Sequence, residues 1–444
     1  MKKHTTYKDS GIEWAPRIPI DWQARPVKGV FDVQLGKMLQ NDAGSPDDLH
    51  VPYLKALHVN WGIVDTEDLP EMWAGAPELK QYGVRDGDLL VCEGGEVGRS
   101  GIVYNPPKNC IIQNALHRVR VENGADIRFL MYVLHAVASA EWFSILCNKA
   151  TIAHFTREKL TALKIPIPND EEQEQIADFL DCKVAQIDQL VAKKERMIEL
   201  LKEERAAAIN QAVTKGLDPN VETKDSGIEW LGKIPKHWQL KRLKHLLNDD
   251  MGIKIGPFGS ALKSEFITSS GYKVYGQENV IADDFNVGYR YIDQAKFSEL
   301  AVYELLAGDV IVTMMGTTGK SKVVPDGIPV GIMDSHLIRM RFNMLAIPEF
   351  VSMLINDSFY IYSQLKISSK GSIMEGLNST IVCSLLIALP SKEEQEELLR
   401  YLKKELLRID TILQKEMQGI GLLREYRTAL ISEAVTGKID VRNA

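Results

Sequence analysis

Two long stretches of the chain place apolar residues at steps of three and four, or multiples of them, among mainly polar neighbours. In the first stretch, which begins at Glu171, the apolar positions are Ile176, Leu180, Val184, Ile187, Val191, Ile198, Leu201 and Ala208. In the second stretch they are Leu398, Leu402, Leu406, Ile409, Leu413, Ile420, Leu423 and Leu430. A heptad-like seam of this kind is typical of helices that pair along one apolar face. About 40 residues at a rise of ~1.5 Å predict two rods of roughly 60 Å.

Both predicted helices have recognisable starts, with a proline, a capping residue and an acidic first turn. These residues are Pro168 with Asn169 or Asp170, and Pro390 with Ser391. We expect Gly419 and Gly421 to weaken or kink the second helix. Because one such helix cannot bury its seam alone, we expect the two to pair. The alternative is that each helix packs on its own globular domain.

The pattern between the helices is different, with short β-branched runs flanked by glycine. Strands are predicted for the runs GDLLVC (87–92), SGIVY (100–104), DVIVTM (309–314) and KVYGQENVI (273–281). Two longer segments, Asp126–Leu146 and Ala346–Leu365, predict helices that are buried on one face. Each of these regions is therefore expected to form an α/β or α+β domain.

The chain is an internal repeat. KDSGIEW occurs at Lys8–Trp14 and again at Lys224–Trp230, an offset of 216 residues. GDLLVCEGGEVGRSGIV (Gly87–Val103) aligns with GDVIVTMMGTTGKSKVV (Gly308–Val324) at an offset of 221, and the starts of the two long helices align at 222. Collinear matches with a slowly drifting offset indicate a duplicated unit and a pseudo-two-fold arrangement. The predicted parts are domain 1 (1–167), a central helix (168–222), domain 2 (223–390) and a C-terminal helix (391–444).

Charge and composition exclude several classes of protein. The formal net charge is −7 for 444 residues, and residues 168–222 alone hold 13 acidic and 7 basic side chains, so both domains are close to neutral. Such domains can still carry a basic face, and Lys254, Lys263 and Lys273 indicate one in domain 2. No apolar run is long enough to span a bilayer.

The N-terminus and the cysteines point to the cytoplasm. The first residues lack the apolar core of a secretory signal. The cysteines show no CxxC spacing, which argues against zinc and for a reducing compartment; they are Cys92, Cys110, Cys147, Cys182 and Cys383. We therefore expect a cytoplasmic protein.

The segment MMGTTGKS (Met314–Ser321) resembles a phosphate-binding P-loop but does not meet its requirements. The first glycine of the motif should stand at Met314, and the loop should open a helix, whereas strand and turn residues follow Ser321. The repeat partner carries Glu93 and Glu96 where phosphate would lie. We expect instead a tight strand–turn–strand with a basic residue, Lys320 or Arg99, at its lip.

Two further motifs are rejected by comparing the copies. NPPK (Asn105–Lys108) lacks the aromatic fourth residue with which amino-methyltransferases stack on a flipped base. Pro46-Asp47 with Glu78-Leu79-Lys80 imitates a nuclease metal site, but Lys80 aligns with Ala301 in the second copy. We therefore expect no catalytic residues and no metal site in this chain.

In combination, several segments resemble the specificity subunit of type I restriction-modification enzymes. They are LGKML (Leu35–Leu39), GDLLVCEGGEVGRSGI, KDSGIEWLGKIPKHW (Lys224–Trp238), GPFGSALK (Gly256–Lys263) and the EEQEQIADFLD helix. The resemblance covers nearly the whole chain. It implies two target recognition domains joined and closed by helices that pair as an antiparallel coiled coil.

The resemblance also implies partners and a role. The chain would bind double-stranded DNA, assemble with two methyltransferase subunits and with endonuclease/translocase subunits, and itself be non-catalytic. Those partners would bind S-adenosylmethionine, ATP and Mg, so no cofactor is expected in this chain. A scaffold with divergent faces suits the reading of two half-sites of one duplex.

Candidate DNA contacts are basic, amide or tight-turn residues of the divergent segments. In domain 1 they are Lys37, Lys55, Asn60 and Arg99. In domain 2 they are Lys254, Gly256, Ser260, Lys263, Gln277, Asn279 and Lys320, with Gly256, Pro257 and Gly259 shaping the loop. The alternating pairs Arg118/Arg120 and Arg339/Arg341 are expected to face either DNA or a partner subunit.

Two other functions remain open at this point. A coiled-coil scaffold that holds protein partners without reading DNA would fit the same helices. A self-sufficient restriction-methylation enzyme would require a cofactor motif, and none is found.

Overall fold

The structure is a computed structural model that describes residues 3–122, 124–147, 154–248, 251–315, 317–369 and 377–442. The chain divides into two compact units. Unit 1 comprises Met1–Glu195 and Met417–Ala444, and unit 2 comprises Arg196–Glu416. Each unit therefore contains one globular domain and a part of each long helix.

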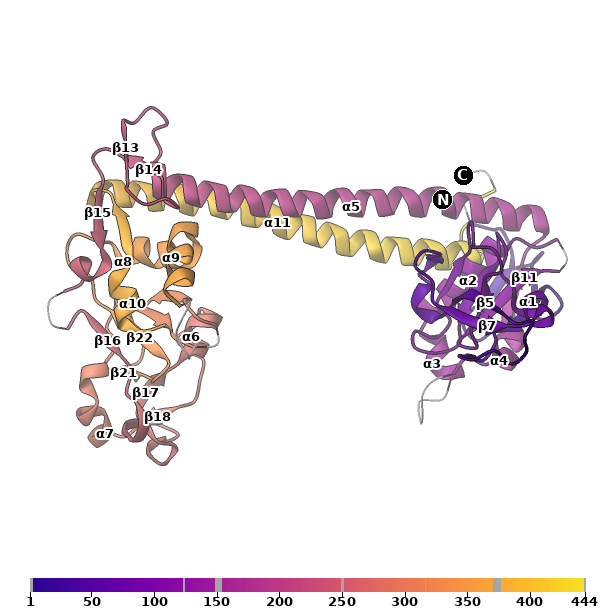
Figure 1. Ribbon diagram of the computed structural model, residues 1–444, viewed down its shortest axis with the longest axis horizontal. Coiled ribbons are helices and arrows are strands. Elements are labelled where there is room, and N and C mark those ends of the chain that lie inside the picture. Colours follow the sequence, from indigo (N-terminus) through magenta and orange to yellow (C-terminus); the bar gives the residue numbers. More distant parts are fainter. Residues whose placement is uncertain are drawn as a thin grey trace. The chain divides into compact units, whose positions relative to one another are not determined.

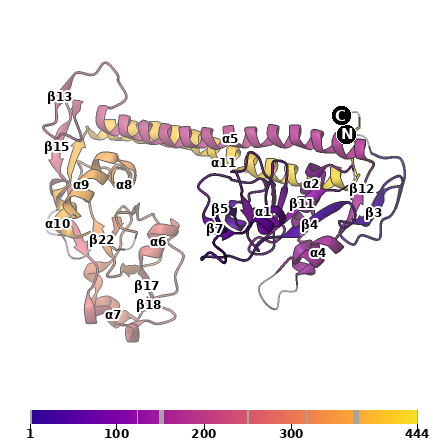
Figure 2. The same ribbon diagram turned by 45° about the vertical axis from the view of Figure 1, so that its right-hand side comes forward.

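Unit 1 is built on a five-stranded sheet of order β4-β11-β8-β9-β6 and a three-stranded sheet of order β10-β5-β7. The strands of these sheets are β4 (Phe31–Leu35), β5 (Leu49–Leu54), β6 (Gly62–Ile63), β7 (Glu71–Ala74), β8 (Leu89–Cys92), β9 (Ser100–Ile102), β10 (Ile111–Ile112) and β11 (Leu116–Val121). Two smaller pairs are β1 (Tyr7–Asp9) with β2 (Arg17–Pro19), and β3 (Gln23–Pro26) with β12 (Lys164–Ile167), the latter visible in Figure 2. The shorter helices are η1 (Ala56–His58), α1 (Ala76–Tyr82), α2 (Ile127–Ser139), α3 (Trp142–Leu146) and α4 (Arg157–Ala162).

Unit 2 repeats this plan, with sheets of order β16-β22-β19-β20 and β18-β17-β21. Their strands are β16 (Ile253–Ile255), β17 (Tyr272–Tyr275), β18 (Tyr291–Ile292), β19 (Val310–Thr313), β20 (Ser321–Val323), β21 (Gly331–Met333) and β22 (Leu337–Met340). The smaller pairs are β13 (Thr223–Asp225) with β14 (Lys233–Pro235), and β15 (Gln239–Arg242) with β23 (Leu386–Leu389). The shorter helices are η2 (Leu243–Leu246), η3 (Gly259–Leu262), η4 (Ser264–Phe266), α6 (Gln277–Ala282), α7 (Gln294–Glu299), η5 (Ala301–Tyr303), α8 (Pro348–Asp357), α9 (Phe359–Ser369) and α10 (Ser379–Ser384).

The two long helices are α5 (Asp170–Lys215) and α11 (Lys392–Val435) (Figure 1). Their starts follow the predicted caps, because Asn169 Oδ1 accepts the amide of Glu172 at 2.9 Å and Ser391 Oγ accepts that of Glu394 at 3.3 Å. Helix α11 continues without a break through Gly419 and Gly421.

Both long helices contribute to the core of each unit. In unit 1, Leu180 of α5 and Ile431 of α11 lie in the core cluster that also contains Phe129. In unit 2, Val213 of α5 and Leu402 of α11 lie in the cluster with Phe350. The alternative in which each helix packs only on its own domain is therefore wrong. All sixteen predicted seam positions are buried or half-buried.

Three predicted elements differ from those observed. The helix predicted over 126–146 is interrupted between α2 and α3 at Glu141, whose φ is +55°. The helix predicted over 346–365 is likewise divided between α8 and α9 at Ser358. The strand predicted over 273–281 ends at Tyr275, because the side chain of Asn279 caps the backbone at Gly276 and starts α6.

Candidate nucleic-acid interface

Each unit presents three segments built on equivalent parts of the scaffold. We call them the first loop, which follows β4 or β16; the capped turn, which follows β5 or β17; and the hairpin turn, which joins β8 to β9 or β19 to β20. In unit 1 they span 36–48, 55–60 and 93–99. In unit 2 they span 256–271, 276–282 and 314–320. All the residues predicted to contact DNA, except Lys254 on β16, lie in these segments.

The first loops leave the sheet through a glycine that closely approaches the backbone. A Cβ on Gly36 would overlap the carbonyl of Gln113, and a Cβ on Gly256 would overlap that of Asp334. Their amides donate to the equivalent carbonyls of Leu116 and Leu337, each at 3.0 Å. Gly256 is therefore required by the fold at this position, in agreement with the loop-shaping role predicted for it.

The capped turns are held by different side chains at one equivalent position. In unit 1 the amide of Lys55 donates to Nδ1 of His58 at 3.2 Å. In unit 2 the amide of Gly276 donates to Oδ1 of Asn279 at 2.9 Å. Burial, and then the charge of Lys55, lowers the pKa of His58 and so favours the neutral ring that this bond requires.

The hairpin turns are the strand–turn–strand units predicted from GGEVGRS and GTTGKS. Strand β8 pairs antiparallel with β9, and β19 pairs antiparallel with β20. Gly98 and Gly319 have φ values of +77° and +79°, which a side chain would strain. The prediction that Ser321 leads into a strand, and not into the helix of a P-loop, is confirmed.

Hydrogen bonds tie the segments of unit 1 to one another and to neighbouring residues. Arg99 Nη2 donates to the carbonyl of Ala56 in the capped turn at 2.9 Å, and Arg99 Nη1 pairs with Glu96 at 2.9 Å. Trp61 Nε1 also donates to Glu96, at 2.7 Å. The carbonyl of Lys37 accepts the amide of Asn114 at 2.9 Å, beside the strands that carry the capped turn.

The segments of unit 2 are tied by other residues. Lys322, on the strand that follows the hairpin turn, pairs with Asp283 at the end of α6 at 2.6 Å. Arg290 Nη2 bonds Glu278 of the capped turn at 2.8 Å and Asp334 at 2.9 Å, and Asp334 is the residue against which Gly256 packs. Gly256 and Gly276, which are separated in sequence, thus both lie against this charged cluster.

The predicted contacts include exposed, half-buried and buried residues. Asn60, Lys263 and Lys320 are exposed, while Lys55, Lys254, Gln277 and Arg99 are half-buried. Lys320 makes no ion pair with a described residue. Only the backbone of Ser260 is described, and it lies in η3.

Lys37 and Asn279 are buried, which changes their predicted role. Lys37 Nζ pairs with Glu78 and donates to Gln40 at 2.7 Å. Asn279 is fully buried, and its amide nitrogen donates to the carbonyls of Asp284 and Val287. These side chains hold their loops in shape and do not face outward to contact DNA.

The paired arginines are structural, so both roles expected for them are wrong for the buried members. Nη1 of Arg118 donates to the carbonyls of Gln81 and Gly83, and Nη1 of Arg339 to those of Val302 and Glu304. Their neighbours Arg120 and Arg341 pair with Asp88 and Asp309, respectively. Each bonding partner in unit 2 stands 221 residues after its counterpart in unit 1. The aligned pair Asp88 and Asp309 could therefore have revealed this network from the sequence.

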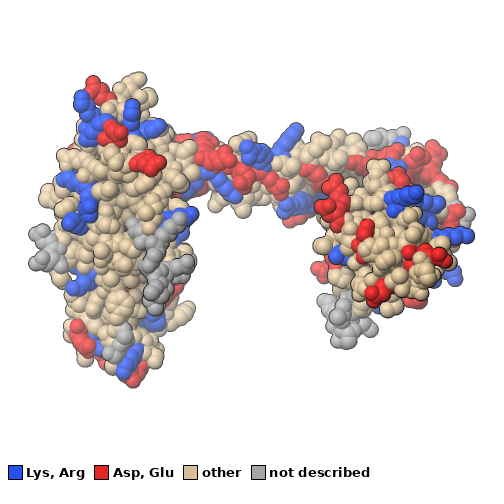
Figure 3. Space-filling model, in the orientation of Figure 1, with Lys and Arg blue, Asp and Glu red and all other residues tan. Residues whose placement is uncertain are grey.

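The basic face expected in unit 2 is also reduced. Lys273 is buried, and its ammonium donates to the carbonyl of Asn286 at 2.7 Å. On the face shown in Figure 3, the Lys and Arg side chains of unit 2 are scattered among uncharged residues.

Two exposed apolar side chains of the first loops were not predicted from the sequence as candidate contacts. Met38 and Phe258 each stand two residues after the close-approach glycine, and they are 74% and 62% exposed. Their equivalence follows from aligning LGKM with IGPF, which separate inspection of the two loops does not reveal. Such side chains can contact a thymine methyl group or insert between base pairs.

The other candidate sites give no catalytic centre. Within the described ranges, no group of three or more His, Cys, Asp or Glu residues could hold a metal ion. The Glu78 carboxylate of the rejected nuclease motif is occupied by Lys37. No helix in the described part of the chain is long and apolar enough to cross a membrane.

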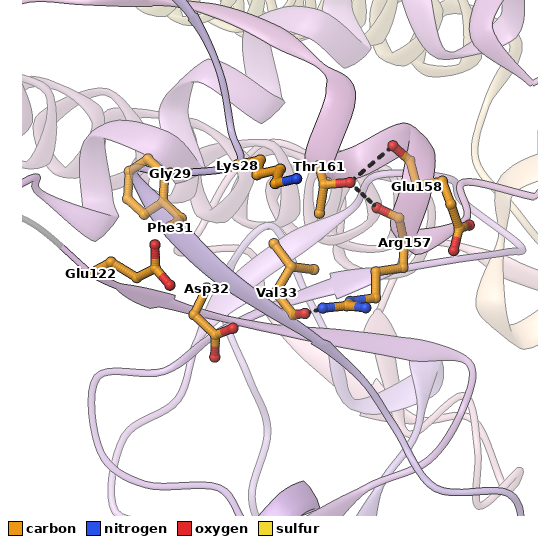
Figure 4. A pocket seen from close by; sticks show the side chains of 9 residues that line it. All are labelled: Lys28, Gly29, Phe31, Asp32, Val33, Glu122, Arg157, Glu158 and Thr161. Atoms are coloured by element: carbon orange, nitrogen blue, oxygen red, sulfur yellow. Dashed lines mark hydrogen bonds between the residues drawn. The ribbon is translucent and has the colours of Figure 1, made fainter.

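A pocket of about 370 Å³ in unit 1 lies between β4 and α4 (Figure 4). Asp32, Glu122 and Glu158 line it together with Lys28 and Arg157. The guanidinium of Arg157 is directed to the carbonyl of Val33, to which Nε donates at 2.7 Å. Three carboxylates against two cations disfavour a phosphate ligand here.

The chain matches the family model described as the type I restriction modification DNA specificity domain over residues 19–200. It is 22% identical to the type I restriction enzyme MjaVIII specificity subunit of Methanocaldococcus jannaschii, with 96% of this chain and 95% of that protein covered. It is also 22% identical to the EcoKI specificity subunit of Escherichia coli K12, with 96% and 90% covered.

Solved structures share the fold at low sequence identity. A chain from a structure on complex assembly and conformational transition of the type I R-M system has a TM-score of 0.70 at 13% identity, covering 95% of this chain and 99% of that one. The HsdS subunit from Thermoanaerobacter tengcongensis has a TM-score of 0.58 at 14% identity, with 95% and 98% covered.

Proposed function

Because the chain belongs to the family of type I restriction-modification specificity subunits, we propose that it reads a bipartite DNA target and directs partner subunits to it. Unit 1 reads one half-site and unit 2 the other. The chain itself is a recognition subunit and carries out no chemical step. We also propose, from the sequence, that it acts in the cytoplasm.

The observation that carries this proposal is the repeated set of three segments with different side chains. Both units use a close-approach glycine, a capped turn and a glycine-containing hairpin turn. The side chains displayed on them differ, for example Asn60 in unit 1 against Gln277 and Lys263 in unit 2. Sites that must recognise different sequences on one frame require this combination. The protein-only scaffold is therefore not favoured.

We propose that α5 and α11 pair as an antiparallel coiled coil that acts as a spacer. Ion pairs within each unit support this arrangement. In unit 1, Arg427 Nε lies 3.2 Å from Asp188 and Arg424 Nη2 lies 3.0 Å from Glu195. In unit 2, Arg408 Nη2 lies 2.5 Å from Glu204. As the residue numbers along α11 increase, those of their partners along α5 decrease. This order is the one that antiparallel helices produce.

The proposed partners are two methyltransferase subunits and, for cleavage, endonuclease/translocase subunits. S-adenosylmethionine, ATP and Mg belong to those partners. The KDSGIEW segments support two identical partners, because Glu13 and Glu229 are exposed and the same residue type is kept at both sites. The neighbouring residues of these segments are explained by the local turn, in which Asp9 and Asp225 cap the amides of Gly11 and Gly227.

Methylome sequencing tests the function directly. A host that expresses this chain with its methyltransferase subunit should acquire methylation at one motif with two specific halves and a spacer of fixed length. A host that expresses the methyltransferase subunit alone is the control and should lack this motif. Methylation without a bipartite motif would contradict the proposal.

A further inference from the structure

Arg290 links the capped turn of unit 2 to Asp334, the residue that directly follows β21. Its Nη2 donates to Glu278 at 2.8 Å and to Asp334 at 2.9 Å. The Arg290 side chain is 37% exposed and that of Glu278 is 44% exposed, whereas that of Asp334 is only 5% exposed. One carboxylate of the pair is therefore fixed in the protein interior, and the other lies at the surface.

The backbone around Arg290 is shaped to admit its guanidinium. A Cβ at Gly276 would overlap both Nη2 of Arg290 and Oε2 of Glu278, so the guanidinium lies over a position that only glycine leaves free. Asp334 is itself held, since its Oδ1 accepts the amide of His336 at 2.9 Å while its Oδ2 faces Arg290. The guanidinium is thus oriented before any ligand arrives.

This arrangement is absent from unit 1. The amide of Val274 donates to the carbonyl of Arg290, and the equivalent amide of Tyr53 donates to that of Pro70. Pro70 thus occupies the place of Arg290. Leu57 and Gln113 stand where unit 2 has Glu278 and Asp334. The charge cluster therefore belongs to one reading domain and not to the shared scaffold.

The geometry points to Arg290 as a specificity-determining residue that reads a guanine in the half-site of unit 2. Asp334 keeps the guanidinium oriented, and the acceptors of the guanine edge replace the exposed carboxylate of Glu278. This inference rests on the proposed function, since it assumes that unit 2 binds DNA.

Guanine is the base that suits this group. Its O6 and N7 are two adjacent acceptors in the major groove, and arginine is the side chain that most often contacts them. The bonds to described residues use only Nη2, so Nη1 and Nε keep donors for a ligand. A buried carboxylate behind the guanidinium restricts its rotation and lowers the entropy lost on binding.

Arg290→Lys and Arg290→Gln, made in the full chain bound to its methyltransferase subunit, test this assignment. The wild-type complex is used first to define the methylated motif. Binding is then measured by competition with duplexes in which each G·C pair of the second half-site is replaced in turn by A·T. We expect wild type to discriminate on the order of 10- to 100-fold at one guanine. Both variants should lose most of this discrimination there and keep it at all other positions.

Two further variants separate this role from folding and from charge. Glu278→Gln keeps the Arg290–Asp334 pair and removes the competing carboxylate, so it should retain the guanine preference and bind at least as tightly as wild type. Lys320→Gln removes an exposed cation from the hairpin turn of unit 2, and it should weaken all duplexes equally.

The outcomes distinguish this inference from the proposed function. If wild type methylates no bipartite motif, the proposed function fails. If the motif is bipartite but Arg290→Lys reads every position as wild type does, or if the change falls in the half-site of unit 1, only the assignment of Arg290 is overturned. An Arg290 variant that loses discrimination at every position, while Glu278→Gln also loses it, likewise overturns the assignment, since the loop itself would then have collapsed.

Discussion

Single side chains at equivalent positions perform the same task with different chemistry. His58 Nδ1 and Asn279 Oδ1 both accept the amide that starts a capped turn. Arg99 and Lys320 stand at one position of the hairpin turn, but Arg99 is bonded to Glu96 and Ala56, whereas Lys320 is exposed. The guanidinium of arginine has several N–H donors, so it can bond a neighbouring loop and still keep part of its charge at the surface. Lysine has a single ammonium group and lacks this fork of donors.

The first prediction concerns phosphate contact by the hairpin turns. Lys320→Gln and Arg99→Gln should each weaken binding to all duplexes and reduce the salt-dependence slope by about 1, because each removes one counterion-releasing contact. Arg99→Gln should have the larger effect on affinity, since it also loses the bond to the capped turn. The measurement is DNA affinity of the assembled complex between 50 and 200 mM salt, a range over which such contacts respond strongly.

Lys236→Gln is the control for this experiment, because Lys236 is exposed, pairs with Glu222 and lies outside the three segments. Its slope should equal that of wild type. An unchanged slope for Lys320→Gln would remove Lys320 from the interface.

At the scale of elements, the long helices are continuous although α11 contains two glycines. Gly419 lies against the side chain of Lys194, and Gly421 faces open space. Neither glycine has a positive φ. The glycines therefore weaken the helix through propensity alone, and the packed seam compensates for it.

The second prediction follows from this environment. Gly419→Ala and Gly421→Ala should each stabilise α11 by about 0.5–1 kcal/mol. The new Cβ at 419 meets only the flexible end of Lys194, at 3.3 Å, and the one at 421 meets nothing. Hydrogen exchange of α11 amides should slow in both variants. Gly256→Ala is the opposite control, and it should destabilise unit 2, because its Cβ would overlap the backbone of Asp334.

Buried and half-buried histidines distinguish the elements of unit 1 from those of unit 2. Burial is the main cause that lowers the pKa of His58, His117 and His135, and for His135 burial and the charge of Arg427 lower the pKa to about 4. The equivalent positions of unit 2 are the non-titrating residues Asn279, Ile338 and Asn356. Unfolded histidines titrate near pH 6.5, so below that pH unfolded unit 1 binds more protons than folded unit 1.

The third prediction is that unit 1 loses stability selectively as the pH falls. The loss begins near pH 6.5 and grows toward the lowered folded pKa, and His135 alone should cost roughly 2 kcal/mol at pH 5. Hydrogen exchange at pH 7 and pH 5, corrected for intrinsic rates, should show reduced protection in unit 1, with unit 2 as the internal reference. His135→Asn should lessen the difference. Equal loss in both units would contradict this explanation.

At the scale of the molecule, each core is closed by parts of both long helices, so neither domain is a segment that is independent of the rest of the chain. Leu430 and Ile431 pack into the core of unit 1, although they lie more than 200 residues after β12. The first loop, the capped turn and the hairpin turn of each unit, in contrast, lie on sheets that one continuous stretch of the chain forms. Recognition can therefore change while the helical frame stays constant.

The fourth prediction uses this separation. A chimera whose residues 1–167 come from another family member should change one half of the methylated motif and leave the other half and the spacer unchanged. Methylome sequencing gives the result, and circular dichroism checks that the chimera has kept its helix and strand content. A change in both halves, or in neither, would mean that the units do not read separate half-sites.

The sequence alone determined the repeat, the long helices with their caps, the hairpin turns and the family, because these depend on local periodicity and on comparing two copies. The contact residues predicted from it, except Lys254, also fall in the three segments, although the strand predicted through Gln277 proved to be a helix. Only the tertiary structure decided which side chains face outward. Lys37, Lys273 and Arg339 are buried against carboxylates or carbonyls that lie far away in sequence, while Arg290 obtains its place from Glu278, Asp334 and Gly276. A charged residue has no periodicity that reveals its partner, so its role depends on contacts that folding alone creates.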